Sequence, residues 1–421
     1  MTALLKDHAT ETAAMKDIRG KVERGELPVG LAAELASRTY VEACIKTAAG
    51  LVYSHLPPMA IVGQAAAAAA FGSRVVIDAS AAAALTLLDP ATVDTLVGAF
   101  LALETTDTAY RDALGAQQSL DMLSTMTLGW DEKQNRPRIT ETGQDEAEAF
   151  ARRADRVVEL LARSERRGWP GLKRFAEFAS DGTWLSALDL AISEQRAFWC
   201  DDRALRQLAA SEGVQAFGTV ELLSALEGAG LLAPALGAAV RAKLIAGYHV
   251  DLDFDPDVLT LAAELDGWAP KGAAAALARA HSWTDPAGCV RFANTAIART
   301  ASSSPTGITQ WTAAVALGLV RITDGNVQSA SGNLEILLTN QLAQPWLGPD
   351  TLPFVMQGIR DAMDELTGVL DPLPAVLART YIQIAKKHGA PRAAEFLLML
   401  VRNLSEEDRI DAVRIIFTSK D

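Results

Sequence analysis

The sequence predicts an α/β protein: a parallel sheet flanked by helices, with a helical segment before it and an all-helical region after it. Short apolar strands alternate with helices of about ten to fifteen residues between residues 73 and 254, the pattern of a parallel sheet. Beyond residue 255 the apolar periodicity is only helical, and the chain is rich in Ala and Leu, which favour helices. We therefore expect three domains, at residues 1–72, 73–254 and 255–421.

The first part of the chain predicts helices that lead into a strand. Helices are expected over residues 10–53, with one break, and over 59–71, where small residues dominate. A Gly-Ser-Arg break then precedes the strand 75–77. The apolar segment 101–103 leads into a turn-like Thr-Thr-Asp at 105–107 and a further helix.

The middle of the chain continues the alternation of helices and strands. Residues 131–145 are polar without apolar periodicity, which predicts a loop. The other elements expected before residue 228 are helices from 80 to the Asp-Pro break at 89–90 and at 91–100, 146–167, 183–195, 203–212 and 220–227, and strands at 197–200 and 214–217.

Acidic residues follow the predicted strands. Asp78 comes directly after the strand 75–77, Asp201 and Asp202 follow the strand 197–200, and Asp112 lies on the helix after the strand 101–103. The carboxyl ends of parallel strands lie at one edge of a sheet, so these acids are expected to gather there. Because clustered carboxylates repel each other without a cation, the pattern favours a divalent-metal site.

Two segments resemble a known family. The stretch that begins Trp199-Cys-Asp-Asp-Arg-Ala-Leu-Arg-Gln-Leu and ends at a strand followed by Gly218-Thr219 resembles PIN domains, as does Asp78-Ala-Ser after its strand. This is the metal-dependent ribonuclease fold common in bacterial toxins, and the resemblance covers about residues 75–250. It implies that several acids hold Mg²⁺ or Mn²⁺, with Asp78 as the first, Asp112 as the second and Asp201, with Asp202 beside it, as the late acid.

The resemblance also implies a further acid and substrate-binding groups. Asp181 and Asp189 lie on the segment where PIN domains carry their remaining acid, but neither has the expected spacing. The hydroxyls of Ser80 and Thr219 are expected to donate to a ligand or to a substrate phosphate. The implied reaction is hydrolysis of RNA phosphodiester bonds by a metal-activated water.

Each acid also has a plainer interpretation. Asp78 and one of the pair Asp201 and Asp202 precede helices, so they are candidate N-caps. Asp112 is equally well explained as an exposed helix residue. Thr219 is a candidate N-cap of the helix 220–227. Both interpretations stay open from the sequence.

A basic face on the helix 146–167 has two explanations. Arg152, Arg156, Arg163 and Arg167 are spaced by 4, 7 and 4 residues, which places them on one side of the helix. They are candidates for contact with an RNA backbone. Acidic residues interleaved with them favour instead an exposed, ion-paired helix face.

Composition excludes several classes of function. The net charge of −13 argues against sequence-independent coating of DNA. Glycine-rich dinucleotide and phosphate-binding motifs are absent from the sequence, so no nucleotide cofactor is expected. The N-terminus lacks the apolar core of a signal peptide, and no apolar run is long enough to span a membrane. These features, with three dispersed cysteines, predict a cytoplasmic protein without a membrane partner.

Two functions remain. One is a metal-dependent endoribonuclease of a bacterial stress or defence system, which the acids Asp78, Asp112 and Asp201 favour. The alternative is a catalytically degenerate PIN-like module that binds a protein partner or serves as a scaffold through its helical C-terminal region, which the missing fourth acid favours. A phosphatase of the haloacid dehalogenase type is disfavoured, because its first strand needs Asp-x-Asp and this chain has Asp78-Ala-Ser80.

Overall fold

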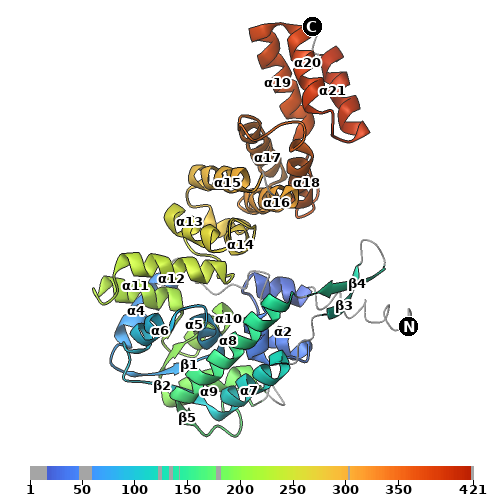
Figure 1. Cartoon of the computed structure of the whole chain (residues 1–421). Helices are drawn as coiled ribbons and strands as arrows, with labels where there is room; N and C mark the ends of the chain where they lie inside the picture. Colours follow the sequence, from blue (N-terminus) through green and yellow to red (C-terminus); the bar gives the residue numbers. More distant parts are fainter. Residues whose placement is uncertain are drawn as a thin grey trace. The chain divides into compact units, whose positions relative to one another are not determined.

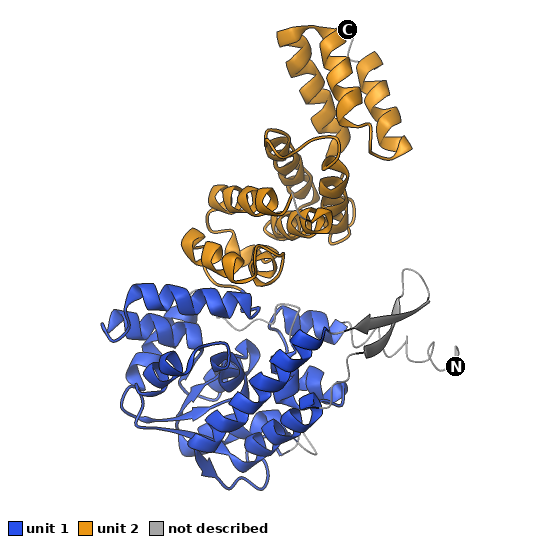
Figure 2. Cartoon of the chain, in the orientation of Figure 1, with its two compact units in different colours: residues 1–250 blue, residues 251–421 orange. Residues whose placement is uncertain are grey.

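The computed structural model describes residues 17–46, 59–121, 126–131, 136–141, 143–176, 182–301 and 304–418. The chain divides into two compact units, unit 1 over residues 1–250 and unit 2 over residues 251–421 (Figure 2). Unit 1 holds a parallel sheet flanked by helices, and unit 2 is helical in its described residues, so the predicted fold class is confirmed.

The sheet of unit 1 has five parallel strands in the order β5-β2-β1-β6-β7. Val75, Val76 and Ile77 of the central strand β1 are fully buried, as expected where helices cover both faces of a parallel sheet. The strands are β1 Arg74–Ile77, β2 Ala102–Thr106, β5 Glu165–Arg167, β6 Ala197–Trp199 and β7 Ala216–Phe217. A separate antiparallel pair joins β3 Met126–Asp131 to β4 Arg136–Glu141.

Three predicted boundaries are wrong. Strand β2 continues through Thr106, so the turn expected at 105–107 is instead the end of a strand and the start of a helix. Residues 165–167 form the strand β5 rather than the last turn of a helix, because their backbone pairs with β2. The predicted loop 131–145 contains the strand β4.

Helices surround the sheet of unit 1 (Figure 1). The short helices α2 and α3, from the N-terminal part of the chain, pack on each other, and α3 also packs on α5, α7 and α8. Residues 17–23 are helical as well. The remaining bounds are α2 Val29–Leu35, α3 Tyr40–Ile45, α4 Met59–Ala69, α5 Ala79–Leu85, α6 Pro90–Val97, α7 Asp107–Asp121, α8 Gln144–Arg163, a 3₁₀ turn Thr183–Leu185, α9 Ser186–Glu194, α10 Arg203–Ser211, α11 Thr219–Gly228 and α12 Pro234–Ala246.

Aromatic side chains fill the core on one side of β6. Trp199 and Phe217, from the adjacent strands β6 and β7, are fully buried and stack with ring centroids 6.1 Å apart. Phe100 packs against both rings, at 5.6 and 5.9 Å. These contacts hold the carboxyl end of β6, from which two of the predicted site residues follow, in a fixed position.

Unit 2 is built from helices that pack on helices one or two positions away along the chain. The contact between α16 and α18 is extensive, and a Cβ on Gly358 would lie 2.4 Å from the carbonyl oxygen of Thr309, so only glycine permits this approach. Its elements are α13 Pro256–Leu265, α14 Gly272–Leu277, a 3₁₀ turn Ala280–Ser282, α15 Pro286–Ala301, α16 Pro305–Arg321, α17 Val327–Leu342, α18 Leu352–Met363, α19 Leu373–His388, α20 Ala390–Leu400 and α21 Glu406–Thr418. Within the described ranges of both units, no helix has the length and apolar character needed to cross a membrane.

Candidate functional site

Asp78 lies at the carboxyl end of β1 and is buried, with 1 % of its surface exposed. It caps α5, because its Oδ2 accepts from the backbone N–H of Ser80 at 2.9 Å. The same oxygen accepts from the hydroxyl of Tyr40 at 3.0 Å and from the Sγ of Cys200 at 3.5 Å. Burial raises the pKa of Asp78, and these hydrogen bonds oppose that rise.

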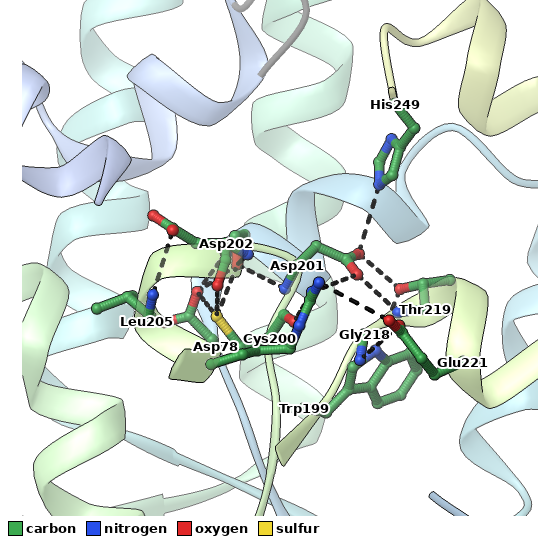
Figure 3. Close-up of polar contacts among 12 residues, drawn as sticks. Asp78, Trp199, Cys200, Asp201, Asp202, Leu205, Gly218, Thr219, Glu221 and His249 are labelled. Carbon is green, nitrogen blue, oxygen red and sulfur yellow. Dashed lines mark hydrogen bonds and ion pairs between the residues drawn. The ribbon is translucent and has the colours of Figure 1, made fainter. Parts of the chain in front are cut away.

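Asp201 and Asp202 point to opposite sides of the end of β6 (Figure 3). Asp202 lies on the side of Asp78. Its Oδ1 caps α10 by accepting from the N–H groups of Ala204 and Leu205, at 3.0 and 3.3 Å, and its Oδ2 accepts from the N–H of Val29 at 2.7 Å. Burial raises the pKa of Asp202 to about 6, and the negative charge of Asp78 adds to the rise.

Asp201 belongs to a different polar network. Its two oxygens accept from the backbone N–H and the hydroxyl of Thr219, each at 2.6 Å. The buried guanidinium of Arg206 lies 3.9 Å from Asp201, and the Nε2 of His249 lies 3.7 Å from it. Arg206 also donates to the carbonyl of Cys200 at 2.7 Å. Asp201 therefore links the end of β6 to the start of α11. Its side chain points away from Asp78 (Figure 3).

Asp112 is buried on α7 and binds the start of α3. Its Oδ1 accepts from the N–H of Tyr40 at 3.2 Å, and its Oδ2 accepts from the N–H of Val41 at 2.9 Å. The first N–H groups of a helix have no partner within the helix and carry its positive dipole end, so a carboxylate stabilises them. Burial raises the pKa of Asp112; the hydrogen bonds from α3 lower it, and the charge of Asp78 adds to the rise.

Asp189, the other acid predicted from the sequence, is fully buried on α9 and holds a loop. It accepts from the indole N–H of Trp169 at 2.7 Å and from the backbone N–H groups of Lys173 and Arg174 at 2.8 and 2.6 Å. Both carboxylate oxygens of Asp189 therefore accept hydrogen bonds. Asp181 lies outside the described residues.

Three of the acids accept hydrogen bonds from residues of α2 and α3. Asp78, Asp112 and Asp202, here called the acidic cluster, receive four hydrogen bonds from Val29, Tyr40 and Val41. Backbone N–H groups at the starts of α2 and α3 therefore stabilise two of the three carboxylates, Asp112 and Asp202. Sequence reasoning missed the donor residues, because three of the four donors are backbone N–H groups, which every residue except proline carries.

The acidic cluster does not fit a divalent cation in this arrangement. Mg²⁺ needs several oxygen ligands free to coordinate it, whereas both oxygens of Asp112 and of Asp202, and the Oδ2 of Asp78, accept hydrogen bonds from the protein. Across the described parts of the chain, no group of three or more His, Cys, Asp or Glu residues is placed to hold a metal ion.

The two predicted substrate-binding hydroxyls are buried within the same networks. The Oγ of Ser80 accepts from the N–H groups of Asp201 and Asp202, at 3.0 and 3.2 Å, and lies in contact with Asp78. The hydroxyl of Thr219 donates to Asp201 and accepts from the indole of Trp199 at 3.1 Å. Both side chains have no exposed surface, so neither is presented to a substrate here.

The predicted arginine face is engaged in contacts within the protein. Arg156 donates to the carbonyl oxygens of Thr86 and Leu88, just after α5, and so acts as a structural cap. The other three form ion pairs: Arg152 with Glu148 at 3.5 Å, Arg163 with Asp94 at 3.9 Å, and Arg167 with Glu104 and Glu194, each at 3.7 Å. Arg152 and Arg163 are largely exposed, and their pairs are of the weak surface kind. Arg167 lies on β5 and not on the predicted helix face, and its partner Glu104 is buried.

The parallel sheet has acids at the ends of β1 and β6 and a further acid on the helix after β2, the arrangement that the resemblance to PIN domains implies. Residues 76–211 match the model of a family described as "PIN domain associated with the TPR-GreAB-C-PIN system". The match covers about a third of the chain, and it confirms the predicted resemblance for this segment. No curated protein and no solved structure matches the chain.

Proposed function

We propose that this chain is a PIN-like protein-interaction component, in which the acidic cluster anchors α2 and α3 instead of binding a divalent cation. The observation that carries the proposal is the set of four hydrogen bonds from Val29, Tyr40 and Val41 to the carboxylates. A cation could enter only by displacing them.

The energetic cost of that displacement supports the proposal. A hydrogen bond to a charged group contributes about 1.5–3 kcal/mol to stability. Displacing α2 and α3 would also expose the apolar side chains of Val41 and Ile45, which are 0 % and 1 % exposed. Mg²⁺ gives up its bound water reluctantly. It therefore competes poorly for carboxylate oxygens that already accept hydrogen bonds from the protein.

The helical unit and the matched family fit an interaction role. The regular elements among the described residues of unit 2 are all helices, and helices packed side by side present extended surfaces to a partner. The description of the matched family names a system with several components. A chain that joins a PIN-like domain to a helical unit is suited to connect such components.

A second candidate function is a metal-dependent endoribonuclease, with Mg²⁺ or Mn²⁺ as cofactor and RNA as substrate. The observation that favours it is convergence: Asp78 and Asp112 come from different elements, and both bind Tyr40. In this candidate, α2 and α3 must leave the acidic cluster before a cation binds.

Binding of Mn²⁺ by calorimetry and cleavage of RNA in its presence distinguish the two functions in the full chain. The key variant is Val29→Pro with Tyr40→Phe, which removes two of the four donors. Proline is tolerated at the first position of α2, and Pro28 before it has the extended backbone that a following proline requires (ψ 145°). Val29→Ala with Tyr40 intact is the control, since it shortens the side chain and keeps the N–H.

The proposal expects neither saturable Mn²⁺ binding nor RNA cleavage from the wild type, the double variant or the control. Cleavage by the wild type that Asp78→Asn abolishes would refute it. Cleavage by the double variant alone, again abolished by Asp78→Asn, would establish the second candidate, with α2 and α3 as an inhibitory segment.

A further inference from the structure

Unit 2 contains a groove that the PIN-type domain does not explain. Its volume is about 1090 Å³, and its lining comes mainly from α15 and α17, with Leu319 of α16 and Ile322 just after α16. Trp346, in the segment after α17, also lines it. We call it the α15–α17 groove.

The groove has the dimensions of an extended chain rather than of a compact ligand. Its lining runs along α15 from Pro286 to Arg299, which at about 1.5 Å per residue is a length of about 20 Å. An extended peptide of about six residues spans that distance, at about 3.3 Å per residue. The volume is also at the upper limit of pockets for small molecules, about 300–1,000 Å³.

The charge of the groove differs from that of the chain. The protein has a net charge of −13, whereas the two charged side chains among the described residues that line the groove, Arg291 and Arg299, are both positive. Arg291 has an exposed partner, Asp285, at 3.7 Å, a separation at which surface pairs contribute little. Arg299 lies over the ring of Trp268. A ligand with carboxylates complements this pair of guanidinium groups.

Side-chain amides and an apolar surface complete the lining. Asn294 donates to Asn340 at 2.6 Å, which links α15 to α17, and Gln344 donates to the backbone of α17. A carboxamide has both a donor and an acceptor, so the lining suits an extended backbone, whose peptide groups have both; a helix satisfies its own. Ile336 of α17 is 67 % exposed and lines the same groove, which gives an apolar side chain a place to bind.

We propose that the α15–α17 groove binds an extended, acidic segment of a partner protein, with carboxylates on Arg291 and Arg299 and an apolar side chain on Ile336. The proposal rests on the role of the chain as a protein-interaction component and gives that role a place and a partner chemistry.

The test uses the full chain and a fluorescein-labelled peptide of about ten residues, alternating Glu and Leu, in a fluorescence-anisotropy titration. The same peptide with Lys in place of Glu and a single-stranded RNA of similar length are the comparison ligands. We expect the acidic peptide to bind and the basic peptide to bind at least about tenfold more weakly, a difference of about 1.4 kcal/mol.

Matched variants locate the binding. Ile336→Glu places a negative charge in the groove and is expected to weaken binding of the acidic peptide at least about tenfold. Ile410→Glu is its control, because Ile410 is 52 % exposed on α21 of the same unit and does not line the groove. Arg291→Ala with Arg299→Ala is expected to have an effect like that of Ile336→Glu, and Arg409→Ala, an exposed residue of α21, none. Unchanged circular dichroism confirms that each variant is folded.

Three results would overturn the inference: no binding of the acidic peptide, equal binding of both peptides, or binding that Ile336→Glu leaves unchanged. If the RNA binds and the groove variants lose that binding, the groove is a nucleic-acid site, which would also refute the inference. None of these substitutions touches the acidic cluster. A negative result for peptide binding in the groove is therefore distinct from a negative result for the proposed function, which is tested by Mn²⁺ binding and RNA cleavage.

Discussion

Replacing Asp202 by Asn is expected to change how the stability of unit 1 depends on pH. Asp202 has a pKa of about 6 in the folded protein, against 3.8 for the free side chain, because folding buries its carboxyl group. Well below pH 4 the group is protonated in both the folded and the unfolded states, so its ionisation costs nothing. Above about pH 6 it is charged in both, and folding must remove that charge from water.

The magnitude follows from the two pKa values. A shift from 3.8 to about 6 corresponds to about 3 kcal/mol, since one pKa unit is about 1.4 kcal/mol. In the wild type this term lowers the free energy of unfolding as the pH rises from about 4 to about 6, because the folded state binds the proton more tightly. Asn does not titrate. Between pH 4 and pH 7 the variant is therefore expected to gain about 2.4 kcal/mol of this total relative to the wild type, because the group in the unfolded state is already partly ionised at pH 4.

The measurement is urea unfolding at pH 4, 5, 6 and 7, followed by hydrogen exchange in peptides that cover β1 and β6, which reports unit 1 alone. Asn retains an acceptor for the α10 cap but cannot accept from both α10 and Val29, so a pH-independent offset is also expected. The test is therefore whether the stability difference between Asp202→Asn and the wild type changes with pH. Asp121→Asn, at the exposed end of α7, is the control and should follow the wild type.

A stability difference between Asp202→Asn and the wild type that stays constant from pH 4 to pH 7 would refute the reasoning. A difference that changes in the opposite direction would show that the hydrogen bond from Val29 outweighs burial and holds the pKa of Asp202 below that of the free side chain.

Three further substitutions test the contacts around the PIN-type domain. Asp112→Ala leaves two buried N–H groups of α3 without an acceptor and should lower the free energy of unfolding by about 2–4 kcal/mol, measured in urea, whereas Asp121→Ala should change it by less than about 0.5 kcal/mol. Asp189→Ala should release the loop that it holds and speed trypsin cleavage there; an unchanged digestion rate would count against that role. Arg156→Ala should cost about 1–3 kcal/mol through the lost cap after α5, and Arg163→Ala less than about 0.5 kcal/mol; equal thermal shifts in the two variants would contradict the structural role of Arg156.

The placement of Asp78 could be predicted from the sequence, because a run of β-branched residues followed by an acid and a helix-forming segment marks the end of a buried strand. The choice between Asp201 and Asp202 could not. Successive residues of an extended chain point to opposite faces, so the sequence shows only that the two diverge. Which one approaches Asp78 depends on the parallel register that pairs Ile77 with Trp199.

The contacts of α2 and α3 with the acidic cluster were beyond sequence reasoning for another reason. Val29 and Asp202 are separated by 173 residues, and Tyr40 and Asp112 by 72. Each of these bonds uses a backbone N–H, so no residue type marks the donor. The alternatives weighed for Asp78 and for the pair after β6 were a helix cap and a metal ligand; the structure places Asp78 and Asp202 as caps.

The strand β5 was missed because Glu165, Arg166 and Arg167 have low strand propensity. Their backbone becomes extended only through pairing with β2. The same composition has a consequence for the behaviour of the protein at high concentration. β5 lies at one border of the sheet, where unpaired peptide groups invite strands from other molecules, and three consecutive charges oppose such recruitment. At the other border, β7 is only two residues long and offers little to a foreign strand. Both ends of the sheet are thus protected against edge-to-edge aggregation.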